Sequence, residues 1–335
     1  MTKPVGIALI GMGWWGKKML AVLAAAPGDI RVVRAVEPDL ASVQALCAEK
    51  DIPVSADYAD ALNDPAVEAV VLATPHALHE QQIEAAVAAG KHVFCEKPLA
   101  LTKAGAEKAV ALCRDAGLIL GMGHERRWEP PIAQMLTAAD DGRLGRLHQI
   151  EANFSHDKFL ALDRNNWRLR ADQAPAGGMT ATGIHLLDLS VRLMGQAESV
   201  LCICEKLSSD LPNGDTVAAF VKFRSGGTSY VSASLANPFM SRFTVYGSKG
   251  WIDIRDKAHV ESPDGWIVTS AMAGGPITTV EVGPAEPVKD NLVSFARAVR
   301  GTEVYPITAA HLVDNIALLE AIFASALSGK IETVA

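Results

Sequence analysis

Two short motifs near the N-terminus combine the groups needed to hold a dinucleotide and to act on an oxygen atom. The segment Gly11–Gly16 (GMGWWG) has the glycine spacing of a turn that places a pyrophosphate at a helix N-terminus. The tripeptide Glu96-Lys97-Pro98 puts a lysine directly after a predicted strand, and the proline keeps the backbone of Lys97 extended. A nucleotide site together with a rigid cation predicts hydride transfer at a nicotinamide ring.

The context of the glycine turn supports a nucleotide site. A predicted strand precedes it, a predicted helix follows it, and Glu37 ends the next strand, 21 residues after Gly16. A carboxylate at that position accepts hydrogen bonds from both ribose hydroxyls and repels a 2′-phosphate, so we expect NAD rather than NADP. The alternative is that Glu37 caps Pro38-Asp39 or faces solvent.

Further cofactor contacts are expected from the loop that follows the predicted strand Ala69–Ala73. Ligands of parallel sheets bind at the carboxyl ends of the strands, where Thr74 would reach the ribose or the pyrophosphate. His79 alone is more typical of a packing or capping residue, and the two indoles are expected to pack on neighbouring strands and loops. The full set of candidate cofactor contacts is Gly11, Gly13, Trp14, Trp15, Gly16, Glu37, Thr74, Pro75, His76, His79, Glu96 and Lys97.

The elements that position these residues alternate over the first 120 residues. Predicted strands are Val5–Ile10, Val32–Val36, Pro53–Ser55, Ala69–Ala73, His92–Cys95 and Leu118–Met122. Predicted helices are Trp15–Ala26, Leu40–Lys50, Leu78–Ala89 and Lys103–Ala116. This alternation predicts a Rossmann-like α/β domain over residues 1–123, with a doubly wound parallel sheet.

The pattern changes after Gly123 to longer strands with period-two alternation. These are His148–Ser155, Ser199–Glu205, Val217–Phe223, Thr228–Leu235 and Phe239–Tyr246, with a hairpin turn at Gly226-Gly227. Residues 124–335 are therefore expected to form an α+β domain with an open antiparallel sheet, whose free face can meet a partner subunit. The stretch Ala273–Pro287 is predicted to be a surface loop, and a C-terminal helix is predicted over residues 309–327.

Composition narrows the class of protein. The chain has 335 residues, enough for two domains, and a net charge of −7 without a basic block, which argues against nucleic acid or an anionic membrane as a partner. We find no apolar run of transmembrane length and expect a cytoplasmic protein. The five cysteines lack metal-ligand spacing, so we expect buried thiols at Cys202 and Cys204 and no metal site.

These residues together resemble the Gfo/Idh/MocA oxidoreductases, a family named for glucose–fructose oxidoreductase, inositol dehydrogenase and a rhizopine catabolism protein. The resemblance is carried, in order, by Gly11–Gly16, Thr74–His79, Glu96–Pro98, Arg127–Pro130, Gly142–Gly145, Trp167-Arg168, Gly177-Gly178, Gly183–Asp188 and Val245–Gly250, and so covers nearly the whole chain. It implies a Rossmann domain followed by a large open antiparallel sheet through which dimers or tetramers form. It also implies NAD-dependent oxidation of a secondary alcohol of a sugar, cyclitol, sugar acid or related polyol to a ketone, or the reverse.

The resemblance places Lys97 at the nicotinamide and makes His185 the general acid/base, although the two roles can be exchanged. Many relatives carry an aspartate four residues before the histidine, where this chain has Ala181. Thr180 or Thr182 is a candidate replacement. Asp188, one helical turn beyond His185, either fixes the imidazole tautomer or makes a structural bond.

Basic and aromatic residues supply the remaining substrate contacts. Because their segment reaches toward the site in relatives, Lys158 or Arg168 is expected to bind a carboxylate or an acidic sugar. The complete set of substrate candidates is Lys97, Arg127, Lys158, Trp167, Arg168, Thr182, His185 and Asp188. Two rival functions remain: an NAD-dependent glycoside hydrolase that oxidises its substrate transiently, and a non-catalytic NAD-binding regulator.

Overall fold

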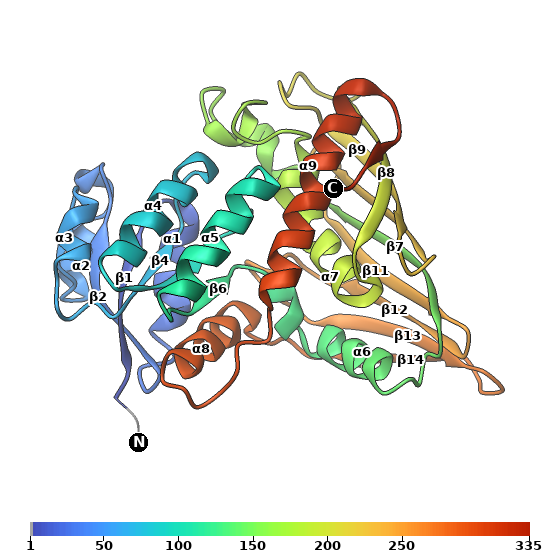
Figure 1. Cartoon of the computed structure of the whole chain (residues 1–335), viewed down its shortest axis with the longest axis horizontal. Helices are drawn as coiled ribbons and strands as arrows, with labels where there is room; N and C mark the ends of the chain where they lie inside the picture. Colours follow the sequence, from blue (N-terminus) through green and yellow to red (C-terminus); the bar gives the residue numbers. More distant parts are fainter. Residues whose placement is uncertain (1–2) are drawn as a thin grey trace. The chain divides into compact units, whose positions relative to one another are not determined.

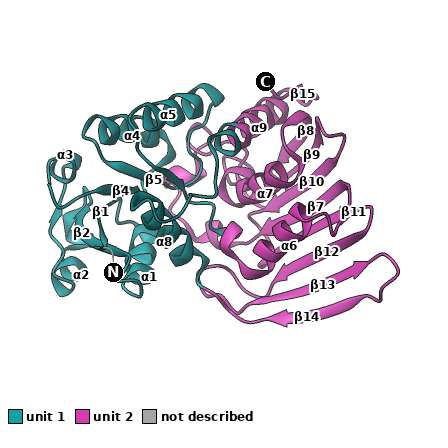
Figure 2. Ribbon diagram, turned by 60° about the horizontal axis from the view of Figure 1, so that its bottom comes forward, with its two compact units in different colours: residues 1–125, 286–313 teal, residues 126–285, 314–335 magenta. Residues whose placement is uncertain are grey.

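The computed structural model describes residues 3–335, which divide into two compact units (Figure 2). The first unit comprises the described residues up to Glu125 together with Glu286–Val313. The second comprises Arg126–Ala285 and Asp314–Ala335. Each unit is built on one sheet.

The first unit is built on a six-stranded parallel sheet in the order β3-β2-β1-β4-β5-β6 (Figure 1). Its strands are β1 (Val5–Ile10), β2 (Ile30–Val36), β3 (Val54–Ser55), β4 (Ala69–Leu72), β5 (His92–Cys95) and β6 (Leu120–Met122). The strands β1 and β4 are buried along their whole length, as expected of central strands covered on both faces. The predicted parallel Rossmann-like sheet is confirmed.

All four predicted helices of this unit are present, one of them divided, and two further helices, Tyr58–Leu62 and Pro287–Val299, were not predicted. They are α1 (Trp14–Leu23), α2 (Gln44–Glu49), α3 (Tyr58–Leu62), α4 (His79–Ala88), α5 (Lys103–Asp115) and α8 (Pro287–Val299), with short 3₁₀ turns η1 (Leu40–Ser42) and η2 (His76–Leu78). The single helix predicted over Leu40–Lys50 is thus η1 followed by α2. A non-helical Val43 separates the two, with φ of −133°.

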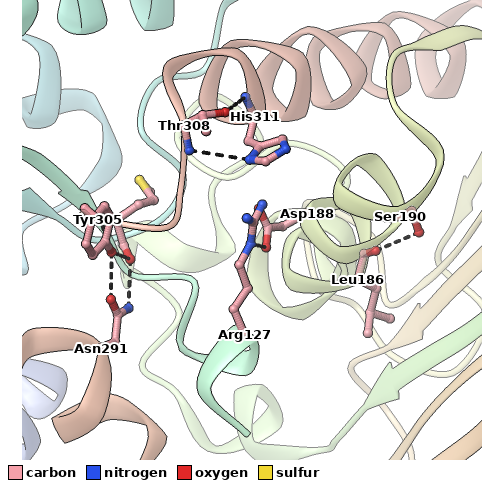
Figure 3. A network of polar contacts seen from close by, with 9 residues as sticks. Arg127, Leu186, Asp188, Ser190, Asn291, Tyr305, Thr308 and His311 are labelled. Atoms are coloured by element: carbon pink, nitrogen blue, oxygen red, sulfur yellow. Dashed lines mark hydrogen bonds and ion pairs between the residues drawn. The ribbon is translucent and has the colours of Figure 1, made fainter. Parts of the chain in front are cut away.

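The helix α8 was not predicted, although it completes the first unit. Its Phe295 packs edge-on against Phe94 of β5, with 5.5 Å between the ring centroids. Asn291 of α8 donates to the carbonyl of Met122 at the end of β6, and Tyr305 donates to Asn291 while accepting from the Met122 amide (Figure 3). A segment distant in sequence therefore holds the last strand of the sheet.

The second unit carries a nine-stranded sheet in the order β14-β13-β12-β11-β7-β10-β9-β8-β15. Its strands are β7 (Leu147–Ser155), β8 (Ala197–Glu205), β9 (Thr216–Phe223), β10 (Thr228–Ser234), β11 (Met240–Gly247), β12 (Gly250–Asp256), β13 (Trp266–Met272), β14 (Thr278–Val282) and β15 (Glu332–Thr333). All neighbouring pairs are antiparallel except β7 and β10. The predicted open sheet is confirmed, and the hairpin at Gly226 joins β9 to β10.

The prediction of a surface loop over Ala273–Pro287 is wrong. The stretch contains β14, which pairs with β13, and it ends where Pro287 opens α8. The strand is short and largely exposed, so it lacks the hydrophobic alternation that marks a half-buried strand. Proline at the first helical position is a favoured start because its missing N–H has no intrahelical partner there.

Helices of the second unit cover part of this sheet. They are α6 (Pro130–Asp140), α7 (Ile184–Met194) and most of α9 (Ala309–Ser328), with short turns η4 (Lys158–Ala161) and η5 (Trp167–Leu169) and a π-turn η6 (Met179–Gly183). The helix α7 packs against β7 and β10. By length and composition α9 is apolar enough to cross a membrane, which corrects our statement that no such run exists. Half of that window is buried inside the protein, and core helices of soluble proteins pass the same test.

Candidate functional site

The glycine turn has the geometry of a phosphate-binding loop. Gly11 has a positive φ of 86°, which a side chain would strain, and a Cβ at Gly16 would lie 2.1 Å from the Gly11 carbonyl oxygen. At Gly13, by contrast, a Cβ would meet no described atom within 4 Å. The first and third glycines thus close the turn, while the second leaves its outer surface open where α1 begins.

Glu37 lies beside this turn. Its Oε2 accepts a hydrogen bond of 2.8 Å from the amide of Met12, and its Oε1 accepts one of 3.2 Å from the amide of Asp39. The first bond ties the acid to the nucleotide loop, and the second is the local cap that was the alternative interpretation. The carboxylate is half-buried, so it keeps solvent access at the end of β2.

The two tryptophans after Gly13 differ in exposure. Trp14 is 55% exposed, so it packs less closely on the neighbouring strands and loops than expected. Its ring instead contacts Trp15, with 5.3 Å between the ring centroids. The first position of a helix that starts at an open loop points outward, which explains why Trp14 finds no core.

The loops after β4 and β5 lie at the same edge of the sheet as the glycine turn. Thr74 donates from its hydroxyl to the side-chain oxygen of Gln82 at 2.5 Å, and its backbone carbonyl faces Nε2 of His79 at 3.1 Å. Nδ1 of His79 lies 2.8 Å from the carbonyl oxygen of Pro98, in the loop after β5. His79 is fully buried, and both of its ring nitrogens face backbone carbonyl oxygens.

Lys97 is half-buried in the loop after β5, and its peptide bond to Pro98 is cis. The Lys97 amide donates to Oε2 of the buried Glu96 at 3.3 Å. A Cβ on Gly123 would lie 2.5 Å from Oε1 of Glu96, so the glycine after β6 makes room for this carboxylate. The lysine is thus carried by a loop whose neighbouring side chains are buried.

His185 lies in the second unit, near the start of α7. The π-turn η6 precedes it, and such turns occur frequently at functional sites. Thr182 donates its hydroxyl to the Phe154 carbonyl oxygen at 2.7 Å, and Thr180 donates to that of Pro175. While these bonds are made, neither hydroxyl can donate to a substrate in place of the missing acid.

A buried ion pair holds the helix that carries His185. Arg127 of the short helix η3 (Glu125–Trp128) and Asp188 of α7 form two bonds of 2.7 Å each, and both side chains are at least 96% buried (Figure 3). A bidentate guanidinium–carboxylate pair fixes both orientation and spacing. Its contacts describe an anchor for α7, which is the structural role considered for Asp188.

The two basic candidates after β7, Lys158 and Arg168, already contact other side chains of the protein. Nζ of Lys158 lies 2.6 Å from the carboxylate of Glu261, which also contacts His259 at 3.1 Å. These two partners hold the pKa of Glu261 at about 2, despite the burial that opposes this shift. The Arg168 guanidinium stacks on the Trp167 ring at 4.3 Å from its centroid. A carboxylate substrate would therefore compete with Glu261 for Lys158.

Sequence reasoning missed the aromatic surroundings of His185. Phe154 of β7 lies 6.4 Å from the His185 ring, and it also contacts Phe239 and His259, at 6.3 and 5.6 Å between centroids. The guanidinium of Arg126 lies 5.5 Å from the centroid of the Phe154 ring. The period-two pattern of β7 marks Phe154 as inward-facing, but only the pairing of the strands brings the other rings to it.

Apolar side chains surround Ala181, the position at which many relatives carry an aspartate. Ala181 packs with Phe159 and Leu162 against the buried cluster Leu169, Leu211 and Leu235. These residues come from segments far apart in the sequence, so no local pattern could have identified them. The alanine is thus part of a hydrophobic wall.

Comparison with known proteins identifies the family to which two long segments of the chain are similar. Residues 5–124 match the family described as "Oxidoreductase family, NAD-binding Rossmann fold", and residues 132–253 match "GFO/IDH/MocA C-terminal domain". A 1,5-anhydro-D-fructose reductase from Ensifer adhaerens is 28% identical over 81% of this chain and 84% of its own length. An inositol 2-dehydrogenase from Saccharopolyspora erythraea is 32% identical over 58% of this chain and 55% of its own.

Solved structures establish the same fold over the full length. An aldose-aldose oxidoreductase from Caulobacter crescentus superposes with a TM-score of 0.87 at 23% identity, covering 98% of this chain and 99% of that one. A levoglucosan dehydrogenase in complex with NADH and levoglucosan gives a TM-score of 0.85 at 21% identity, covering 99% of each chain.

Proposed function

Because this chain belongs to the Gfo/Idh/MocA oxidoreductases and its first unit is their NAD-binding Rossmann domain, we propose that it oxidises a secondary alcohol of a sugar, cyclitol or related polyol to a ketone, or catalyses the reverse. The observation that supports this most directly is the position of Lys97. It lies on a buried loop at the carboxyl end of β5, at the same sheet edge as the open glycine turn and Glu37. A cation fixed beside a nicotinamide site suits an oxygen that gains negative charge.

The residues of the first unit fit the cofactor. The open surface at Gly13 and the free amides at the start of α1 suit a pyrophosphate, and Glu37 suits the adenosine ribose. When bound, NAD accepts the hydride from the carbinol carbon. The carboxylate of Glu37 also favours a ribose hydroxyl over a 2′-phosphate.

Two side chains handle the hydroxyl proton in this proposal. His185 removes the proton from the substrate hydroxyl, and Lys97 donates a hydrogen bond to the oxygen as alkoxide character develops. Loss of this proton and of a hydride leaves the ketone, so the reaction balances. The buried Arg127–Asp188 pair keeps α7, and with it the imidazole, in one orientation.

The test is Lys97→Met, with Lys97→Arg as a charge-retaining control. We expect kcat to fall by about 10²–10⁴-fold while NAD affinity changes little, because this is the range for removing one catalytic donor or proton carrier. Turnover is read from NADH appearance over a panel of sugars, cyclitols, sugar acids and dihydrodiols. Full activity of Lys97→Met would refute the assignment. Release of free sugar from a glycoside without net NADH would favour the hydrolase alternative.

We also propose that two copies of the chain associate through the open face of the large sheet. Leu201 of β8, Phe220 of β9 and Tyr230 of β10 lie directly opposite one another across three strands, and all three are exposed. Ile203 adds to the same face. An apolar row of this kind on a face without helices is self-complementary and suits a symmetric dimer interface.

A further inference from the structure

His79 connects the two loops that border the proposed nicotinamide site, and each of its ring nitrogens faces a backbone carbonyl. Nδ1 lies 2.8 Å from the oxygen of Pro98, and Nε2 lies 3.1 Å from the oxygen of Thr74. The ring is fully buried at the first position of α4. Pro98 directly follows Lys97, so one of the two contacts is made to the residue next to the proposed catalytic lysine.

A carbonyl oxygen can only accept a hydrogen bond, which restricts the protonation of the ring. A neutral imidazole carries a single N–H, so it can satisfy one of these two oxygens but not both. Burial lowers the pKa of His79, and its two carbonyl contacts oppose this shift. The ring is then neutral near physiological pH, and the shorter contact, to Pro98, is the one expected to hold the proton.

We propose that His79 is a positioning residue whose Nδ1–H donates to the Pro98 carbonyl and thereby fixes the backbone at Lys97. The inference rests on the proposed catalytic role of Lys97. Pro98 is buried and has no N–H of its own, so its carbonyl is the only backbone group of this residue that can form a hydrogen bond. The helix α4 packs against β5 and α5, which gives the imidazole a rigid base.

The position of the proton suggests a pair of variants with opposite outcomes. Asparagine places an amide N–H close to the position of Nδ1, whereas glutamine, closer to histidine in size, places its amide near Nε2. We expect His79→Asn to keep kcat within about threefold of the parent, and His79→Gln and His79→Leu to lower kcat by about tenfold or more. A packing role alone would favour glutamine over asparagine, so the order of the two variants separates the interpretations.

His92→Leu is the matched control. His92 lies on the same strand as the Lys97 loop but at its amino end, where Nδ1 accepts from the amide of Ile119 at 2.9 Å. This substitution should lower the melting temperature but leave kcat within about twofold. Circular dichroism and NAD affinity establish that each His79 variant is folded. If His79→Leu does not fold, the comparison is made with His79→Gln alone.

A second measurement does not depend on activity. In protein labelled with ¹⁵N-histidine, the resonance absent from His79→Asn identifies His79 among the nine histidines. Its nitrogen shifts should report a protonated Nδ1 and an unprotonated Nε2. A proton on Nε2, or equal kcat for His79→Asn and His79→Gln, would overturn the proposal. Retained turnover in Lys97→Met would instead refute the proposed function while leaving the Nδ1 tautomer as measured.

Discussion

The charge of Glu37 can be removed while its hydrogen bond to the glycine turn is kept, which makes cofactor choice the sharpest test of the first unit. Glutamine at this position keeps an oxygen that can accept from the Met12 amide, the bond that measures 2.8 Å in the parent. It loses the negative charge and the second accepting oxygen, whose partner in the parent is the Asp39 amide, outside the glycine turn. The difference between the parent and Glu37→Gln therefore isolates electrostatics from the geometry of the glycine turn.

The expected size of the effect follows from Coulomb's law. A 2′-phosphate carries about −1.5 to −2 charges and would lie about 5 Å from the carboxylate that otherwise accepts the ribose hydroxyls. Because Glu37 is half-buried, the effective dielectric constant lies between about 20 and 80, which gives a repulsion of about 1–7 kcal/mol. The parent should thus bind NADP about ten- to 10⁵-fold more weakly than NAD.

Fluorescence titration of both cofactors with both proteins measures this directly. Glu37→Gln should bind NADP at least about tenfold more tightly than the parent and NAD slightly more weakly, because an amide accepts fewer ribose hydrogen bonds. The difference should shrink with added salt, as expected for partly exposed charges. Parent protein that binds NADP as tightly as NAD would refute the reasoning about Glu37.

Two further predictions concern stability and assembly. The hydrogen-bonded Arg300 holds the pKa of Glu68 at about 2, below its ordinary 4.5, so the pair stabilises the fold above pH 4.5 and loses this effect as the pH falls toward 2. Glu68→Gln should lower the free energy of unfolding by about 1–2 kcal/mol at neutral pH after solvent screening. Urea unfolding should show that this difference between parent and variant becomes smaller in acid. A difference that grows in acid would contradict the prediction. Phe220→Glu should convert oligomers to monomers in sedimentation velocity, whereas Arg114→Glu on exposed α5 should not.

The sequence predicted the first unit well where local signals are strong. Strand β1 was predicted with its observed bounds, because a buried apolar run ends at a glycine that needs a positive φ. The glycine spacing, Glu37 and the loop of Lys97 all follow strands whose carboxyl ends share one edge in any parallel sheet. The parallel arrangement of the strands therefore predicts that these groups lie at one edge of the sheet.

Elements held by distant contacts escaped prediction. The helix α8 has a strong amphipathic pattern, but its role becomes visible only when Phe295 and Asn291 meet β5 and β6. Strands β12 and β13 gain their register from neighbours, not from their own composition. The carbonyl contacts of His79 likewise depend on the distance between two loops, which no local sequence pattern encodes.

The departure at Ala181 shows most clearly why a motif alone does not define a site. The sequence suggested that Thr180 or Thr182 supplies the hydroxyl in place of the acid. In the structure the π-turn widens the backbone before α7, so positions four apart no longer share a face as they do in an α-helix. Both hydroxyls donate to backbone carbonyls, and Ala181 packs on a leucine cluster. While these bonds are made, neither hydroxyl proton is available to a substrate, and our proposal needs only Lys97 and His185.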